Sequence, residues 1–176
     1  MTTPRPASGR DPLTAEASAE ALRRVMADFA SGVTIVTTRW QDVAHAMTAT
    51  AFCSVSLDPP LVLVCVSRAS RFHPAVTGAG QWAVSLLSQD QESVARHFAN
   101  SGRDLRTQFD AVAHHPAPVS GAPVIDGALG WLECRTHAAY DGGDHTILVG
   151  RVLQTSEHPL DARPLTYHRG TYSPAV

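Results

Sequence analysis

The sequence lacks both a run of basic residues and a long apolar segment. It carries 14 Lys and Arg against 16 Asp and Glu, a formal net charge of -2, and the basic residues are scattered along the chain. Nucleic acids and anionic membrane surfaces are bound through clustered positive charge, so we expect neither partner. Residues 1–14 are rich in Pro, Ser, Thr and Arg and have no apolar segment long enough for a signal peptide or a membrane helix. We therefore expect a cytoplasmic protein with a flexible tail at residues 1–16.

Cysteines are few and do not form a recognisable pattern. Cys53, Cys65 and Cys134 show no paired spacing of the kind that binds metals. Their odd number and apolar neighbours predict reduced, buried thiols, and redox catalysis, the other interpretation, would need a thiol of low pKa for which the sequence offers no environment. A Gly-x-Gly-x-x-Gly fingerprint is also absent, which excludes a dinucleotide site of the Rossmann type.

What is present fits one globular domain. The chain has 176 residues, of which 44% are hydrophobic and 17% charged. These values are typical of a folded protein with a single core. No internal repeat divides the sequence, so we assign residues 17–176 to one domain.

Periodicity predicts many strands and two or three helices. An amphipathic helix of about three turns is indicated by four apolar residues on one face, with Ser18 as N-cap and Gly32 just past the end. The four residues are Leu22, Val25, Met26 and Phe29. A capping box at Ser88 and Gln91 predicts a second helix. Strands are predicted at residues 33–38, 47–56, 61–66, 83–87, 129–139, 146–155 and 164–168, with Asp58-Pro59-Pro60 ending the pairing of the second.

This pattern favours a mainly β fold, a barrel with peripheral helices. The strand at residues 61–66 is apolar throughout, which indicates burial on both faces or a place in a barrel core. Residues 100–123 have no sustained period and form a long loop, a length often associated with function. A substrate lid and a dimer contact are both compatible with it.

The segment at residues 47–56 is the most informative for chemistry. Thr48, Thr50, Ser54 and Ser56 share one parity, so in a continuous strand their hydroxyls face one side. Small side chains and hydroxyls allow a flat polar ring to lie against the backbone. The other interpretation is an ordinary solvent-facing strand of Thr and Ser.

The surrounding motifs favour the first interpretation. The chain reads Gly32-Val33-Thr34-Ile35-Val36-Thr37 before this segment and Leu57-Asp58-Pro59-Pro60-Leu61-Val62 after it. Further along come Ser85-Leu86-Leu87-Ser88-Gln89-Asp90-Gln91, Asp141-Gly142-Gly143-Asp144-His145-Thr146-Ile147 and Tyr167-His168-Arg169-Gly170-Thr171-Tyr172. From about residue 22 to residue 172 the chain resembles the flavin reductase-like family, which adopts an FMN-binding split β-barrel.

The resemblance implies a flavin site. Thr48, Ala49 and Thr50 would contact the pyrimidine side of the flavin ring, and Ser54, Val55 and Ser56 the ribityl chain and first phosphate. The loop with Ser67, Ser70 and Arg71 would receive the phosphate, and hydroxyls with a guanidinium are suitable donors for it. A polar turn that begins a helix is the other interpretation of this loop. Ser85, where the family usually has Asn, and Ser88 complete the implied set.

The resemblance also implies a nicotinamide site at His145, with Asp144 as its neighbour and Tyr167 and Arg169 flanking it. From the residues alone, His145 is a solvated turn residue or, with Asp141 and Asp144, part of a metal site. No second histidine lies nearby at ligand spacing, so we assign no metal.

The implied activity is the reduction of FMN or FAD by NADH or NADPH. Hydride passes directly between bound cofactors, so no catalytic protein nucleophile is needed. The family further implies a homodimer and a partner monooxygenase that receives reduced flavin by diffusion. Two alternatives remain: a split-barrel flavin oxidase acting on a phosphorylated pyridine, against which the sparse basic residues count, and a flavin-binding barrel without turnover.

Overall fold

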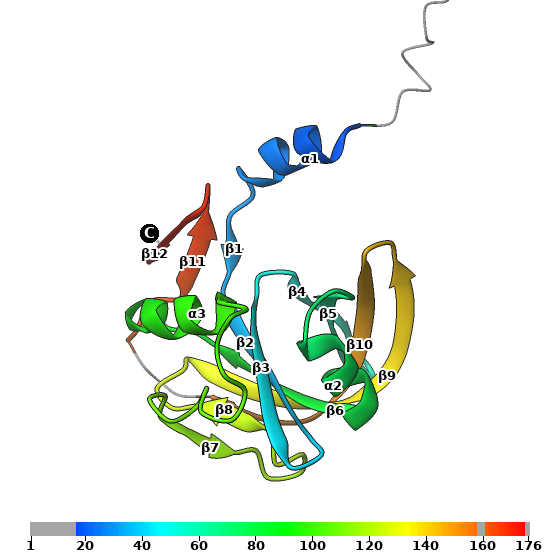
Figure 1. Ribbon diagram of the computed structural model, residues 1–176, viewed down its shortest axis with the longest axis vertical. Coiled ribbons are helices and arrows are strands. Elements are labelled where there is room, and N and C mark those ends of the chain that lie inside the picture. Colours follow the sequence, from blue (N-terminus) through cyan, green and yellow to red (C-terminus); the bar gives the residue numbers. More distant parts are fainter. Residues whose placement is uncertain (1–16, 158–160, 175–176) are drawn as a thin grey trace, which may run out of the picture.

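The computed structural model describes residues 17–157 and 161–174, and its largest element is a strongly curved seven-stranded antiparallel sheet (Figure 1). The strand order is β3-β2-β6-β9-β10-β5-β4. In chain order the strands are β2 (Thr34–Trp40), β3 (Val43–Ala49), β4 (Phe52–Leu57), β5 (Pro60–Ser67), β6 (Gln81–Leu86), β9 (Gly130–Gly142) and β10 (His145–Glu157). The edge strands β3 and β4 are not paired with each other in the described chain, so the barrel is split, as expected from the sequence.

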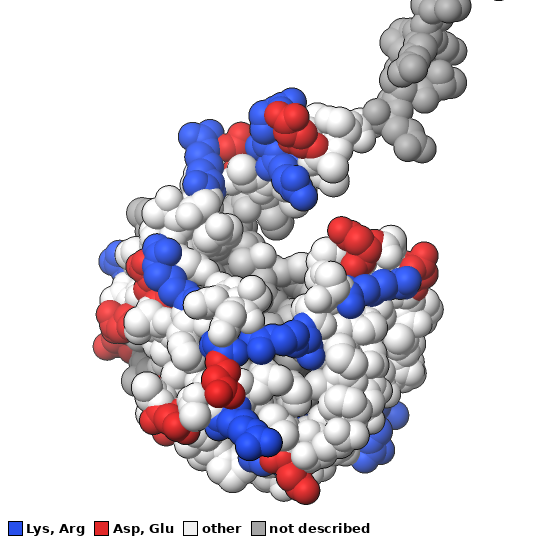
Figure 2. All heavy atoms as spheres, viewed as in Figure 1, with Lys and Arg blue, Asp and Glu red and all other residues white. Residues whose placement is uncertain are grey.

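Smaller elements surround this sheet. A three-stranded sheet has the order β1 (Ser31–Gly32), β11 (Leu165–His168) and β12 (Thr171–Pro174), and β7 (His114–Pro116) pairs with β8 (Pro123–Ile125). The helices are α1 (Ala19–Met26), α2 (Phe72–Ala79) and α3 (Glu92–Ala99), the last preceded by the 3-10 turn η1 (Gln89–Gln91). None of these helices is long and apolar enough to cross a membrane. Charged side chains of both signs are scattered over the face seen in Figure 2.

The segment at residues 47–56 is not one continuous strand, and this prediction was wrong. β3 ends at Ala49 and β4 begins at Phe52. The two strands form opposite edges of the sheet, so the chain must leave one edge and cross to the other between them. The shared parity of the four hydroxyls is lost at this crossing.

The proline segment is a tight hairpin turn. Pairing does not stop there as predicted, because Leu57 pairs with Pro60 across the turn. In β5 the side chains of Val62, Val64 and Val66 are buried and those between them are half-buried. The strand therefore turns one face to the core and is not fully buried on both.

The long loop at residues 100–123 is fastened to β3. The Arg103 guanidinium donates to the carbonyl of Ala46, and Gln108 Nε2 donates to the carbonyl of Ala44 at 2.7 Å. His97 of α3 contacts the Gln108 carbonyl at 2.7 Å. These contacts hold residues 103–108 against β3, which argues against a mobile lid there. The segment is also not a loop throughout, because His114–Pro116 form β7 and pair with β8.

The first helix is shorter than predicted and stands away from the sheet (Figure 1). Ser18 caps it as expected, its side chain accepting from the Ala21 N–H at 3.1 Å, but the helix ends at Met26. Its apolar face is uncovered, with Val25 70% and Phe29 66% exposed. The turn after the helix is anchored, because the Arg169 N–H donates to the Ala27 carbonyl at 2.9 Å, but the apolar face itself is not covered by the described chain.

The three thiols differ in environment. Cys134 is fully buried, and burial together with the neighbouring Glu133 raises its pKa to about 12. Cys65 is half-buried, and burial raises its pKa as well. Cys53 is exposed, so the expectation of three buried thiols was wrong for this residue.

Gly150 of β10 is closely packed against Trp82 and Cys134. A Cβ there would lie 2.4 Å from the Trp82 ring and 2.8 Å from the Cys134 Cβ. We predict that Gly150→Ala lowers the free energy of unfolding by about 1–3 kcal/mol through overpacking. Gly32→Ala is the matched control, since a Cβ at Gly32 meets nothing within 4 Å. Urea unfolding checks this, and equal stability of the two variants would contradict it.

Candidate functional site

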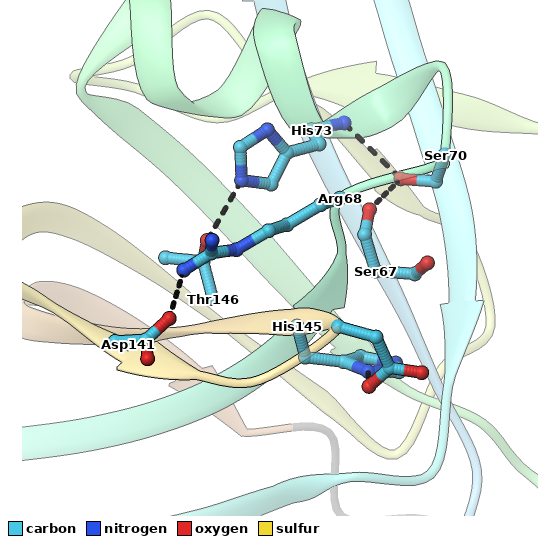
Figure 3. A network of polar contacts seen from close by, with 8 residues as sticks. Ser67, Arg68, Ser70, His73, Asp141, His145 and Thr146 are labelled. Carbon is cyan, nitrogen blue, oxygen red and sulfur yellow. Dashed lines mark hydrogen bonds and ion pairs between the residues drawn. The ribbon is translucent and has the colours of Figure 1, made fainter.

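The loop between β5 and α2 is built to present polar groups. The Ser70 N–H and Oγ both bond the Ser67 carbonyl, at 3.0 and 2.8 Å, and Ser70 Oγ accepts from the His73 N–H at 3.2 Å (Figure 3). His73 Nε2 in turn contacts Thr146 Oγ1 of β10 at 2.8 Å. The loop and the first turn of α2 are therefore rigidly held. Arg71 follows at the helix N-terminus, where backbone N–H groups favour an anion.

The β9–β10 turn lies directly beside this loop. His145 is the register partner of Ser67, and the Arg68 N–H donates to the Asp144 carbonyl at 3.0 Å. An ion pair between Arg68 and Asp141 closes the contact (Figure 3). Two segments far apart in sequence, both predicted as site residues, are thus brought together.

A cavity of about 350 Å³ opens at the loop. Four predicted residues line it: Thr48, Ser67, Ser70 and Arg71. No Asp or Glu is among the lining residues. The cavity is therefore chemically suited to a phosphorylated ligand.

The two threonines predicted to contact the ring have different environments. Thr48 Oγ1 donates to the Ala95 carbonyl of α3 at 2.7 Å, so its proton is used to hold that helix against β3. Thr50 is exposed at the crossing between β3 and β4 and lines a second cavity, of about 470 Å³, with apolar neighbours such as Phe52 and Leu129. Thr50 is thus the one of the two with an uncommitted hydroxyl.

The crossing and the loop are close enough to serve one ligand. The Ala51 carbonyl accepts from the Cys65 N–H at 3.0 Å, and Cys65 precedes Ser67 by two residues, or about 7 Å along β5. Ala49, also predicted, is buried, and its carbonyl accepts from Thr34 Oγ1 at 2.8 Å. This hydrogen bond holds the end of β3, where the crossing begins, against β2.

Residues 54–56 do not belong to this group. Ser54 pairs with Val62, which precedes Ser67 by five residues, or about 16 Å along the strand. In one chain, residues 54–56 and Ser70 are too far apart to bind the same phosphate. The hairpin register thus separates Ser54, Val55 and Ser56 from the loop within one chain, and their implied contact with the ribityl chain and phosphate stays a prediction.

Ser85 and Ser88 are engaged in the scaffold. Ser85 is fully buried, and its Oγ accepts from the Ile125 N–H at 2.9 Å. Ser88 forms the predicted capping box with Gln91 at the start of η1 and is 4% exposed. Neither residue lines the cavity, and the flavin contacts that the resemblance implies for them stay predictions.

The four residues expected around the nicotinamide lie on separate elements. His145 Nδ1 and Asp144 Oδ1 are 2.7 Å apart at the β9–β10 turn, and the bond to His145 lowers the pKa of Asp144. Tyr167 and Arg169 line a pocket beside α1, where Arg169 pairs with Asp28. In the described part of one chain, Asp144 and His145 therefore do not share a pocket with Tyr167 and Arg169. That part also contains no group of three or more His, Cys, Asp or Glu placed to hold a metal.

Two cavity residues were missed by sequence reasoning. Arg103 comes from the long loop, and its guanidinium is fixed by carbonyls of Phe98 and Asn100, at 2.9 and 2.5 Å. His45 of β3 is 8% exposed, and burial, with the nearby charge of Arg71, lowers its pKa. Both are single residues without a motif, so no local signal marks them.

Substitution of the two threonines should have different effects on stability and on flavin binding. Thr48→Val should lower the free energy of unfolding by about 1 kcal/mol, because the partly buried hydrogen bond to the Ala95 carbonyl of α3 is lost. Thr50→Val should leave stability unchanged and weaken flavin binding about threefold to tenfold, the value of one hydrogen bond. Urea unfolding and calorimetric titration with flavin check the pair. Intact flavin affinity in Thr50→Val would refute its assignment.

Known proteins resemble this chain throughout. The family model for the flavin reductase like domain matches residues 26–175. An NADH-dependent FAD reductase of Streptomyces globisporus is 47% identical over 139 residues, covering 78% of this chain and 76% of that protein. An NADH-dependent flavin reductase of a Rhodococcus species is 42% identical over 159 residues, covering 86% and 83%.

Solved structures agree with this. BorF, the flavin reductase component of a bacterial two-component tryptophan halogenase, has a TM-score of 0.83 and 43% identity, covering 90% of this chain and 100% of that one. SgcE6 of Streptomyces globisporus, an NADH:FAD oxidoreductase in complex with NAD and FAD fragments, has a TM-score of 0.83 and 40% identity, covering 97% and 98%. The chain described here therefore belongs to the flavin reductase-like family.

Proposed function

We propose that this chain is an NAD(P)H:flavin oxidoreductase that reduces FMN or FAD and supplies reduced flavin to a partner monooxygenase. The observation that carries the proposal is that three segments meet along β5: the Ala51 carbonyl of the crossing accepts from the Cys65 N–H, the loop at Ser67 to Arg71 continues the strand, and His145 pairs with Ser67. Relatives support it, among them the reductase component of 4-hydroxyphenylacetate 3-monooxygenase in Thermus thermophilus, 42% identical over 153 residues. NADH is the donor named for several of them.

The protein's task is to bind and orient. When flavin and nicotinamide are both bound, they supply the hydride chemistry themselves. Ser70 and Arg71, at the start of α2, would hold the flavin phosphate. Thr50 would donate to the polar edge of the ring, where negative charge develops on reduction. The rigid loop thereby provides proximity and orientation.

The nicotinamide would lie against the β9–β10 turn. His145 is half-buried beside Ser67, and its Nδ1 is fixed by Asp144. Fixing one ring nitrogen orients the other toward a ligand. The turn therefore places a polar group next to the ring and phosphate positions.

We assign the activity to the cytoplasm, where an exposed thiol such as Cys53 stays reduced.

An assay of NADH oxidation with added flavin tests this function. Steady NADH loss that depends on flavin is expected, and His145→Ala should raise the KM for NADH about tenfold with flavin affinity nearly unchanged. The matched control is His115→Ala, since His115 is also paired with a carboxylate, Asp126, at 2.6 Å but lies on another hairpin.

The assay also separates the alternatives. Flavin binding without NADH oxidation would replace the reductase with a flavin-binding barrel. Turnover of a phosphorylated pyridine without NADH would indicate an oxidase. Equal losses of NADH and flavin affinity in His145→Ala would show that His145 has a structural role and does not contact the nicotinamide specifically.

We further propose that the protein is a homodimer assembled through α1. An isolated helix of this length is marginal in water, so it requires tertiary packing. Its apolar face and the exposed Val55 and Leu57 of β4, the latter 90% exposed, provide two apolar surfaces on the same chain. A second copy is therefore the occupant that we propose for α1. It would also bring another Tyr167 and Arg169 into the assembly.

Light scattering coupled to size exclusion tests the dimer. The protein should elute at twice its chain mass of 18.8 kDa, and Val25→Glu should shift it to the monomer by placing a charge in the apolar contact. Arg24→Gln changes the net charge equally but lies in an exposed ion pair with Glu20, and should remain dimeric. A monomeric wild-type protein would overturn this part of the proposal.

A further inference from the structure

His73 of α2 contacts two of the segments that form the site, although it does not line the cavity. Its backbone N–H donates to Ser70 Oγ at 3.2 Å, in the loop at Ser67 to Arg71, the phosphate loop (Figure 3). Its ring Nε2 lies 2.8 Å from Thr146 Oγ1 of β10, and both side chains are half-buried. One residue therefore connects the proposed flavin phosphate site to the strand that begins at His145.

The other links between the phosphate loop and the β9–β10 hairpin all lie at the first end of the loop. The pairing of β5 with β10 ends at Ser67, where the loop begins. Beyond it, the Arg68 N–H donates to the Asp144 carbonyl at 3.0 Å, and Arg68 forms an ion pair with Asp141. The side chains of that ion pair are 48% and 78% exposed, and exposed ion pairs contribute little. The far end of the loop is therefore held to the hairpin through His73.

The packing of α2 does not replace this link. The helix buries Phe72, Ala75 and Val76 and packs mainly on β2. Within residues 17–157 and 161–174, the contact of His73 with Thr146 is the one hydrogen bond between α2 and β10. Loss of this bond would leave the helix in place and allow the phosphate loop to move relative to the hairpin.

We propose that His73 is a positioning residue for hydride transfer, an inference that rests on the proposed reductase function. Its bond to Thr146 fixes the phosphate loop, which would hold the flavin, relative to His145, which would contact the nicotinamide. Transfer between two bound rings requires close and aligned approach, and a displacement of about 1 Å can slow such a step about 100-fold. The bond therefore sets the rate of transfer, whereas the groups that contact the ligands stay the same without it.

Two variants that remove the bond test this role in the full chain. His73→Phe keeps a ring without its nitrogens, and Thr146→Val keeps the shape of the side chain without its hydroxyl. In assays with NADH and FAD, each should lower kcat about tenfold, while the KM for NADH and the Kd of FAD, measured by calorimetry, stay within about threefold. The double variant should lose no more than either single variant, because both remove the same contact.

A rescue variant and a matched control complete the design. The amide of Gln can donate to Thr146 or accept from it, so His73→Gln should restore kcat to within about threefold of the wild-type value. Thr77→Val is the control on the same helix, because the Thr77 hydroxyl donates to carbonyls of α2 itself, at 2.8 Å for His73 and 3.2 Å for Pro74. It should change neither kcat nor either affinity.

Hydrogen exchange of the loop amides provides a readout that needs no turnover. In the ligand-free protein, the N–H groups of Ser70 and His73 should exchange about tenfold faster in Thr146→Val than in the wild type, with exchange in β2 unchanged. Unchanged kcat and loop exchange in both variants that remove the bond, additive losses in the double variant, or a loss of FAD affinity as large as that of kcat would overturn the inference. So would a failure of His73→Gln to restore kcat. Each of these results would leave the reductase function intact, whereas absence of flavin-dependent NADH oxidation in the wild type would overturn the function itself.

Discussion

The antiparallel pairing of β5 with β10 is the constraint on which the site depends. It runs through seven registered pairs and places Ser67 opposite His145. The phosphate loop continues from one strand and the β9–β10 turn precedes the other, so a single register fixes both. Beneath them the ring of Trp82 packs where Gly150 leaves room in β10. The loop and the turn are thus positioned by two rigid paired strands. A shift of the β5–β10 register by one residue would move them apart.

The open sheet supplies the rest of the site. Because the sheet does not close, the chain crosses from the β3 edge to the β4 edge, and that crossing presents Thr50 beside the loop. The segment after α3 then packs on β3 and adds Arg103 to the cavity. Polar groups of three separate segments, namely β3, the β5–α2 loop and the segment after α3, therefore line one cavity without a carboxylate among them. This arrangement explains how a chain of net charge -2 builds a positive pocket.

Local signals predicted the elements well. The capping box at Ser88, the strand periodicity and the turn before His145 are all encoded within a few residues, and the structure has them. Predictions that required knowledge of the neighbouring strand were less successful. Parity grouped Thr50 with Ser54, although the chain changes edges between them. Ser85 has a hydroxyl in a family motif, but its partner is a backbone N–H 40 residues away.

We propose that the flavin lies between Thr50 and the loop at Ser67 to Arg71. A crystal structure of the protein with FAD tests it most directly. We predict a phosphate within hydrogen-bonding distance of Ser70 and Arg71, with the ring beside Thr50. A phosphate bound instead at residues 54–56, with the loop at Ser67 to Arg71 empty, would contradict the account.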